Sequence, residues 1–286
     1  MTESIRHSTP VPKERPSRRV VLSRAATLTL AAAGGAATVA WDTETIVSTH
    51  HTVRIANLVA PCKVVQVSDL HRSWCVSNSF IERCIVAANR HQPDAVLLTG
   101  DFITARTSYM PSCARAIARL RAPLGCYAVL GNHDYASDEW QGAPVITGAL
   151  QQVGVQVLVN TSVSLKNGLR LVGVDDYSTG EPDTGKAFSQ VSARDAVLCM
   201  THNPLEFDIL RGYDVVTIAG HTHGGQIDLP IITDLVLDKR SKYLRGWFHS
   251  DHWPGRMYVS RGLGVLGIPV RINALPEIAV FHLVPA

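Results

Sequence analysis

The sequence of 286 residues predicts an α/β fold, and three observations lead to this class. Short apolar runs alternate along the chain with stretches in which apolar residues recur at the spacing of a helix. Two later runs on either side of Asn167-Gly168 have the form of a hairpin, which makes the sheet partly antiparallel or mixed. Hydrophobic residues make up 46% of the chain, enough for a full core in one large domain or two small ones.

The expected elements run from residue 64 to the C-terminus, and we find no internal repeat or linker among them. Strands are expected at 64–67, 95–98, 127–130, 155–159, 169–174, 197–200, 215–219, 257–260 and 278–283. Helices are expected at 80–88, 114–120 and 145–153. Because the two kinds of element alternate, we expect helices packed in layers on a sheet.

Residues 1–41 have the composition of an export signal. Six Lys or Arg residues against two Glu give residues 1–24 a formal charge of +4, and an uncharged, alanine-rich run follows at 25–41. The adjacent Arg18 and Arg19 in S-R-R-V-V-L resemble a twin-arginine signal, a route for folded proteins. An ordinary secretory signal and a retained N-terminal anchor are the alternatives, and a cleavage point after Ala40 fits a signal that is removed.

The charge of the remaining chain gives no indication of a nucleic-acid partner. The formal total is +3, and the basic leader accounts for all of it, since residues 42–286 carry −1. We therefore expect no nucleic-acid binding.

The six cysteines are scattered and include no C-x-x-C pair, which argues against a zinc ribbon or a thioredoxin-like site. Cys84 in an expected helix and Cys199 in an expected strand should be buried and reduced. The spacing of the cysteines determines no disulfide pairing.

Side chains with metal-binding chemistry follow five of the expected strands, at the point where each strand ends. They are Asp69 and His71, then Asp101, then Asn132, His133 and Asp134, then His202, and finally His221 and His223. Ligand sites in α/β sheets form at this edge. Taken singly, each group could be a helix cap or a turn residue, but those explanations would have to hold at five strand ends at once. Imidazole and carboxylate without thiolate suit two Mn, Fe, Co or Zn ions, about 3.5–4 Å apart across a shared carboxylate.

These motifs resemble those of the calcineurin-like metallophosphoesterases. The chain carries D-L-H, G-D, G-N-H-D, T-H-N-P and G-H-T-H in that order, and the resemblance extends from about residue 64 to the C-terminus. The segments Y-V-S-R-G-L-G at 258–264 and P-V-R-I-N-A-L-P-E-I at 269–278 resemble the bacterial exported branch of the family. Members of this branch often carry twin-arginine signals, in agreement with the leader.

The resemblance implies a fold, a domain and a set of ligands. The fold is a four-layer α-β-β-α sandwich of two stacked mixed sheets flanked by helices, formed by residues 42–286. One divalent metal ion would be held by Asp69, His71 and His223. The other would be held by Asn132, His202 and His221, with Asp101 bridging the two. The ions would be Mn, Fe, Zn or Co, and we favour Mn.

The implied activity is hydrolysis of phosphodiester or phosphomonoester bonds, with attack by a hydroxide that bridges the two metals. His133 is the candidate to protonate the leaving oxygen, with Asp134 holding its ring; alternatively, His133 only stabilises the charged phosphate. Arg261 either binds the substrate phosphate or caps a buried carboxylate. Asp175 and Asp176 should support a turn, because the ligand set is complete without them.

Other protein classes fit the sequence less well. A non-catalytic metal-binding protein of the cell envelope, built on the same fold, is the main alternative, although such proteins usually lose ligands. A metallo-β-lactamase-like enzyme needs H-x-H-x-D-H, whereas His223 is followed by Gly-Gly-Gln. Purple acid phosphatases carry Tyr three residues after the G-D aspartate, where this chain has Thr104.

The implied partners are a phosphate-ester substrate and the twin-arginine export machinery. The expected location is the periplasm, the cell envelope or the exterior, with or without an N-terminal membrane anchor. Peripheral association with the membrane or the cell wall is left open.

Overall fold

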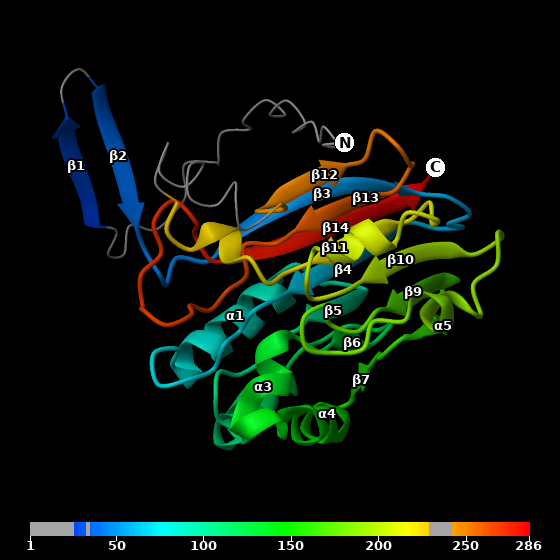
Figure 1. The fold of residues 1–286 in the computed structure, drawn as a ribbon, viewed down its shortest axis with the longest axis horizontal. Helices are drawn as coiled ribbons and strands as arrows, with labels where there is room; N and C mark the ends of the chain where they lie inside the picture. The colour runs from blue at the N-terminus through cyan, green and yellow to red at the C-terminus, as the bar shows by residue number, and fades with distance from the viewer. Residues whose placement is uncertain (1–25, 33–34, 229–241) are drawn as a thin grey trace.

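The computed structural model describes residues 26–32, 35–228 and 242–286, with only the backbone described for 26–41. The twin-arginine motif at 17–22 lies outside the described residues. Two six-stranded sheets dominate the fold (Figure 1).

Both sheets are mixed, as expected. The first has the order β3 (Val47–Ile55), β14 (Glu277–Pro285), β4 (Cys62–Val67), β5 (Ala95–Thr99), β6 (Cys126–Val129) and β7 (Val155–Val157). The second has the order β12 (Gly246–His249), β13 (Arg256–Val259), β11 (Val216–Ala219), β10 (Ala196–Met200), β9 (Leu169–Gly173) and β8 (Thr161–Ser164). In the first sheet, β4 to β7 are parallel and β14 is antiparallel to β4. In the second sheet, β9, β10, β11 and β13 are parallel, and the edge strands β8 and β12 are antiparallel to their neighbours.

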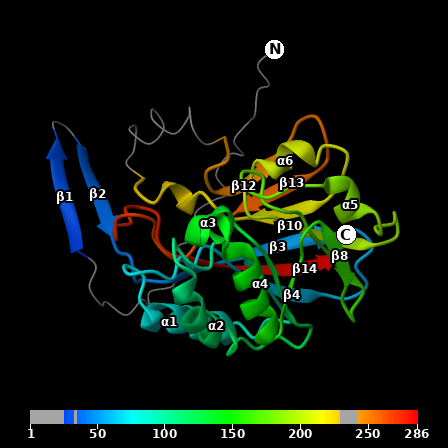
Figure 2. The ribbon, with the colours of Figure 1, turned by 60° about the horizontal axis from the view of Figure 1, so that its bottom comes forward.

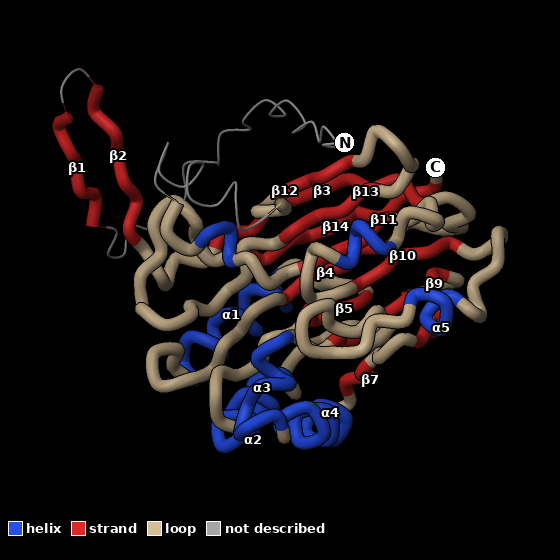
Figure 3. The backbone as a smooth tube through the Cα atoms, in the orientation of Figure 1, coloured by secondary structure: helices blue, strands red, loops and turns tan. Residues whose placement is uncertain are grey.

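Helices cover the outer face of each sheet. They are α1 (Asn78–Arg90), α2 (Met110–Ile117), α3 (Asn132–Trp140), α4 (Gly142–Gln152), α5 (Thr184–Phe188) and α6 (Glu206–Ile209), with 3-10 turns η1 (Thr107–Tyr109) and η2 (His223–Gly225). In Figure 2, α1, α2 and α4 lie on the β4 and β14 side and α5 and α6 on the β10 and β13 side. In Figure 3, α2 and α4 lie below the strands, at the bottom of the view. The predicted four-layer α-β-β-α sandwich is confirmed.

The alternation of side chains along a strand explains the layers. In β4, Val65 and Val67 face the core under α1 and α2, whereas Val64 faces the core between the two sheets. The strands are therefore apolar on both faces, which accounts for the short continuous apolar runs in the sequence. Helix α1 begins where the Ser77 side chain accepts the Phe80 N–H at 3.1 Å, and it buries one stripe against the sheet.

One predicted strand pairing is wrong, and one predicted helix is present with shifted ends. The predicted hairpin partner at 155–159 is β7, which extends the first sheet parallel to β6, and the true partner of β9 is β8. Leu158 N still donates to Ala128 O, so the chain leaves the first sheet only after that residue. Helix α2 also begins four residues before the predicted 114, because Pro111 stands in its first turn, where its missing N–H costs nothing.

Two further strands precede the six-stranded sheets in the chain. Strands β1 (Ala26–Ala32) and β2 (Gly35–Trp41) pair with each other as a separate antiparallel hairpin, which Figure 1 shows apart from the large sheets.

Among the described residues, no helix has both the length and the apolar character needed to cross a membrane. All six cysteines are free, and Cys84 and Cys199 are buried, as predicted.

Candidate metal centre

The predicted ligands meet at one edge of the sandwich, where parallel strands of both sheets end. Strands β4, β5 and β6 carry the D-L-H, G-D and G-N-H-D motifs, and β10 and β11 carry the other two. Several of these ligands have a left-handed backbone, which is uncommon for residues other than glycine. They are Asp69 (φ 53°), His71 (φ 46°), Asp101 (φ 55°), His221 (φ 74°) and His223 (φ 54°). Such strain, concentrated at one place, is typical of a functional site.

The first group of ligands consists of Asp69, His71 and His223. The Nε2 atoms of His71 and His223 lie 3.0 Å apart, and His223 Nε2 lies 3.7 Å from Asp69 Oδ1. All three side chains are buried. Their ligand atoms lie close enough together to hold one metal ion.

The second group consists of Asn132, His202 and His221. His221 Nδ1 lies 2.9 Å from Asn132 Oδ1 and 3.2 Å from His202 Nε2, and the last two atoms are 3.1 Å apart. Three ligand atoms thus form a compact triangle, as a second metal ion would require.

Asp101 connects the two groups. Its Oδ2 atom lies 3.3 Å from His71 Nε2 in the first group and 3.3 Å from His202 Nε2 in the second. Its Oδ1 atom accepts the His133 backbone N–H at 2.8 Å, which fixes the carboxylate plane. One carboxylate oxygen therefore faces both groups, the arrangement of a bridging ligand.

These distances fit bound cations. Metal–nitrogen and metal–oxygen bonds of about 2.0–2.2 Å place two ligands of one ion roughly 3–3.5 Å apart. The separations within the second group and from Asp101 to both groups agree with this range. The protein residues therefore form a donor set that suits two divalent ions, and oxygen and imidazole donors suit Mn, Fe, Zn or Co.

Hydrogen bonds orient two of the imidazole rings. His202 Nδ1 lies 2.8 Å from Thr99 O, and His71 Nδ1 lies 2.8 Å from Thr104 Oγ1. A donor proton on each Nδ1 leaves the Nε2 lone pair directed at the ligand group. Thr104, which stands where a purple acid phosphatase has Tyr, thus supports a ligand in this chain.

The charges of Asp101 and His223 are those that cation binding needs, whereas the neighbouring Asp101 holds the pKa of His202 well above its usual value despite the burial of this ring. Burial alone would raise the pKa of the Asp101 carboxyl, but the neighbouring His202 and His71 lower it well below its usual value. Burial lowers the pKa of His223 well below its usual value, and His71 and Arg271 lower it further. An ionised carboxylate and a neutral imidazole are the forms that bind metal ions.

Glycines make this close packing possible at two positions. A Cβ atom on Gly131 would overlap Asp101 Oδ1 and lie 2.7 Å from the Asp101 backbone N. A Cβ atom on Gly220 would overlap Ser68 Oγ and come within 2.5 Å of Asp69 Oδ2. Any other residue would displace a metal ligand at these positions.

His133 lies beside the first group, but Asp134 does not hold its ring. The His133 ring makes an edge contact with the His71 ring, with centroids 5.0 Å apart. The Asp134 carboxylate instead accepts backbone N–H groups of Asp101, Phe102 and Gly131, each at 2.9 Å. The predicted role of Asp134 is therefore corrected: it joins the start of α3 to the loop that carries Asp101.

Arg261 caps a buried carboxylate, one of the two roles predicted for it. Its backbone N and its Nε donate to Glu277 Oε2 at 2.9 and 3.2 Å, and its side chain packs over Gly224. Asp175 and Asp176 support a turn, as predicted. Asp176 Oδ2 accepts the N–H groups of Ser178 and Thr179 at 3.0 and 2.9 Å.

Arg271 is a residue of this site that the sequence did not reveal. It is fully buried and donates to the carbonyl oxygens of Gly264 and Ala274 at 3.0 and 2.7 Å. Its Nη2 lies 3.2 Å from His223 Nδ1. Its only signal is its place in the 269–278 segment, which gives no indication of what the side chain contacts.

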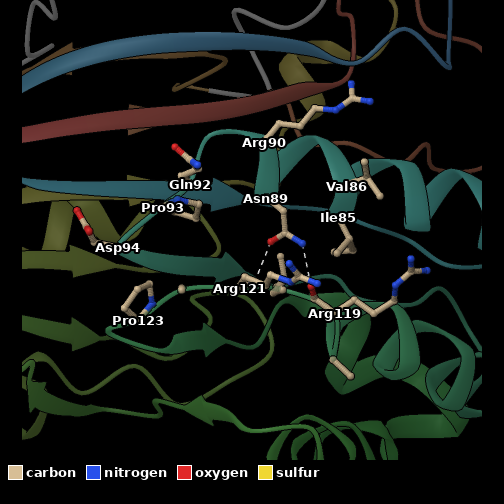
Figure 4. A pocket seen from close by; sticks show the side chains of 13 residues that line it. Ile85, Val86, Asn89, Arg90, Gln92, Pro93, Asp94, Arg119, Arg121 and Pro123 are labelled. Atoms are coloured by element: carbon tan, nitrogen blue, oxygen red, sulfur yellow. Dashed lines mark hydrogen bonds between the residues drawn. The ribbon is translucent and has the colours of Figure 1, made fainter.

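A cavity of about 1010 Å³ lies away from these ligands (Figure 4). It opens at the opposite edge of the first sheet, before β5 and β6, and none of the predicted site residues lines it. Asn89 spans part of its wall by bonding Arg119 O and Arg121 N at 2.8 and 2.9 Å. The metal-binding chemistry is therefore separate from this cavity.

Comparisons with known proteins agree with the motifs. A family model described as calcineurin-like phosphoesterase matches residues 62–225. The metallophosphoesterase YkuE of Bacillus subtilis is 31% identical over 249 residues, covering 83% of this chain and 85% of the relative. The UDP-2,3-diacylglucosamine pyrophosphatase LpxG of Chlamydia muridarum is 28% identical over 274 residues, covering 77% and 83%. A solved dimetal phosphatase from Danio rerio aligns with a TM-score of 0.43 and 12% identity over 75% of this chain and 93% of its own, and at that score the likeness supports no conclusion.

Proposed function

The chain belongs to the calcineurin-like phosphoesterase family, and from this premise we propose that it hydrolyses phosphodiester or phosphomonoester bonds with two divalent cations. The observation that carries the proposal is the position of Asp101 Oδ2, 3.3 Å from a ligand of each group. A single-ion site would need only one of the two groups. A structural role would not explain why buried nitrogen and oxygen lone pairs converge on two points.

Different residues of the chain would have different roles in such a reaction. Two bound cations would make a nucleophile available from water near neutral pH and neutralise charge on the phosphoryl oxygens. The ligands would hold the two cations at fixed places and so determine where the substrate phosphate binds. The His133 ring lies at the margin of the first group, where it can pass a proton to the leaving oxygen.

The names of the relatives suggest which bonds to test. The chlamydial relative is named as a pyrophosphatase of UDP-2,3-diacylglucosamine, so we add phosphoric anhydrides to monoesters and diesters as candidate substrates. We keep Mn as the favoured ion, with Fe, Zn and Co as alternatives, because the donor set suits all four.

Turnover with defined metals tests the proposal. The purified chain, loaded with Mn²⁺, Fe²⁺, Zn²⁺ or Co²⁺, should hydrolyse bis-p-nitrophenyl phosphate or p-nitrophenyl phosphate, and one ion should give the highest rate. Asp101→Ala, which removes the shared ligand, should abolish the rate. Binding of metal without turnover of any ester or anhydride would favour instead a non-catalytic metal-binding protein of the cell envelope.

We also propose export of the folded chain through the twin-arginine route, which would place it in the exported branch of the family. Support comes from Arg18-Arg19 before an uncharged run. Export of a folded chain would let it acquire its metal ions in the cytoplasm. Replacement of both arginines by Lys should retain the protein inside the cell, and unchanged export of the double variant would refute this route.

A further inference from the structure

Two loops beside the metal centre expose large apolar side chains. Trp74, in the loop after β4, is 77% exposed, and Leu266 and Ile268, in the loop after β13, are 38% and 55% exposed. A single exposed apolar residue is ordinary, but several at the edge of one site suggest a contact surface.

A cavity of about 250 Å³ lies between these loops and the loop after β5. Most of its exposed wall is apolar and includes Trp74, Cys75, Tyr109, Val265 and Leu266, and Ser73, Thr104 and Arg106 also line it. Whole small molecules usually occupy pockets of about 300–1,000 Å³, so this one fits one arm of a larger ligand.

The loop that carries Leu266 and Ile268 is held in place by Gln226, three residues after His223. Gln226 Nε2 donates to Leu266 O at 3.0 Å and to Ile268 O at 3.1 Å, and Gln226 Oε1 accepts Leu266 N–H at 2.8 Å. Ile227 and Ile272 form an additional bridge between the same segments. The apolar side chains are therefore presented by a hydrogen-bonded loop that is anchored next to His223.

The cavity adjoins the metal centre. Thr104 lines its wall and also contacts His71 Nδ1 at 2.8 Å. On the other side, Gly264 N donates to Asp69 O at 2.6 Å, directly before Val265. These contacts place the cavity on the far side of the His71 ring from the ligand atoms, so a chain attached to a phosphate at the metals would run around His71 and Thr104 to reach it.

We propose that this cavity is a subsite for an alkyl or acyl chain of the substrate, so that the preferred substrate is an amphiphilic phosphoester. The inference rests on the proposed function and narrows its substrate class. A linear hydrocarbon chain matches the small apolar cavity that Leu266 lines, and the exposed Ile268 lies two residues further along the same loop. Burial of that chain would remove apolar surface of both partners from water.

A pair of diesters that differ only in chain length tests the subsite. The full-length Mn²⁺-loaded chain is given methyl or octyl p-nitrophenyl phosphate, both below the concentration at which the octyl ester forms micelles. The ratio of kcat/KM for octyl over methyl should be about tenfold or more, since each methylene placed in an apolar pocket can contribute about that factor. Equal values for the two diesters would overturn the proposal.

Variants test which side chains cause the preference for the octyl diester over the methyl diester. Leu266→Asn and Trp74→Ser should lower the octyl-to-methyl ratio toward one, and because the ratio is taken within each variant, a general loss of activity cancels. Val59→Asn is the matched control: Val59 is 85% exposed but precedes β4 at the opposite edge of the sheet, so its ratio should equal that of the wild type. A wild-type ratio in both loop variants would show that the chain binds elsewhere.

A binding measurement separates this inference from the proposed function. If no diester, monoester or anhydride is hydrolysed with any of the four ions, the proposed function fails, and calorimetry with octyl and methyl phosphate then decides the subsite. Tighter binding of octyl phosphate, lost in Leu266→Asn, would support the subsite, whereas equal affinities would refute it.

Discussion

Replacement of Thr104 by Val tests whether the residues around the ligands determine metal affinity. Valine keeps the shape of threonine but removes the Oγ1 atom that lies 2.8 Å from His71 Nδ1. The His71 side chain is fully buried, so water cannot readily replace the lost partner. An unsatisfied buried N–H costs about 1–3 kcal/mol, which corresponds to a loss of metal affinity of about 10–100-fold, the range typical for such supporting contacts.

Competition with a fluorescent chelator would measure this loss as the dissociation constant of Mn²⁺. Thr104→Ser is the matched control, because it restores a hydroxyl at the same position and should recover most of the affinity. Thermal unfolding of the metal-free variants should show that the Val protein is folded. Wild-type Mn²⁺ affinity in folded Thr104→Val would refute the view that this hydrogen bond sets the orientation of His71.

Three further substitutions have defined outcomes. Gly131→Ala should lose bound metal and destabilise the fold by about 1–3 kcal/mol, because the new Cβ overlaps Asp101 Oδ1. Gly148→Ala is the control and should leave the metal content unchanged, because a Cβ atom at this position meets no other atom within 4 Å. Arg271→Met should lower the free energy of unfolding by about 3 kcal/mol or more in denaturant titrations, since buried carbonyl groups lose their donors, and unchanged stability would contradict the role of this buried guanidinium. His133→Asn should reduce turnover by about 10²–10⁴-fold with metal content unchanged, and a small effect would leave the residue only a charge-stabilising role.

The sequence predicted the strands that carry the ligands because those strands are buried on both faces. Strands β4, β5, β6, β10 and β11 are short apolar runs bounded by polar motifs, so both their type and their ends are visible in the sequence. Their shared direction then brings the polar residues to one edge. The division of these residues between two metal ions came from the resemblance to the family, and it stays a prediction.

The edge strands were harder to predict, for a physical reason. Strand β8 is exposed or half-buried at every position, and β3 alternates polar side chains with few apolar ones. Neither forms an apolar run, so the hairpin was assigned to β7, which has the apolar residues but pairs in parallel with β6. Pairing at such edges depends on backbone partners that local composition does not specify.

The supporting contacts of the site were also beyond local prediction. Asp134 follows His133 in the chain, yet its carboxylate turns to backbone groups at the start of α3 and in the Asp101 loop. Arg271 finds its partners in irregular segments around 264 and 274. Sequence identifies the chemical type of these residues, whereas the direction of each side chain depends on tertiary packing.

The number of metal ions per chain tests the central claim most directly. After loading with Mn²⁺ and dialysis, elemental mass spectrometry of the wild type should find two ions per chain, and the paramagnetic resonance spectrum should show coupling between them, as expected for ions about 3.5–4 Å apart. Asp101→Ala should lose bound metal and the coupling together. One uncoupled ion per wild-type chain, or two ions that remain coupled without Asp101, would contradict a centre built around that shared carboxylate.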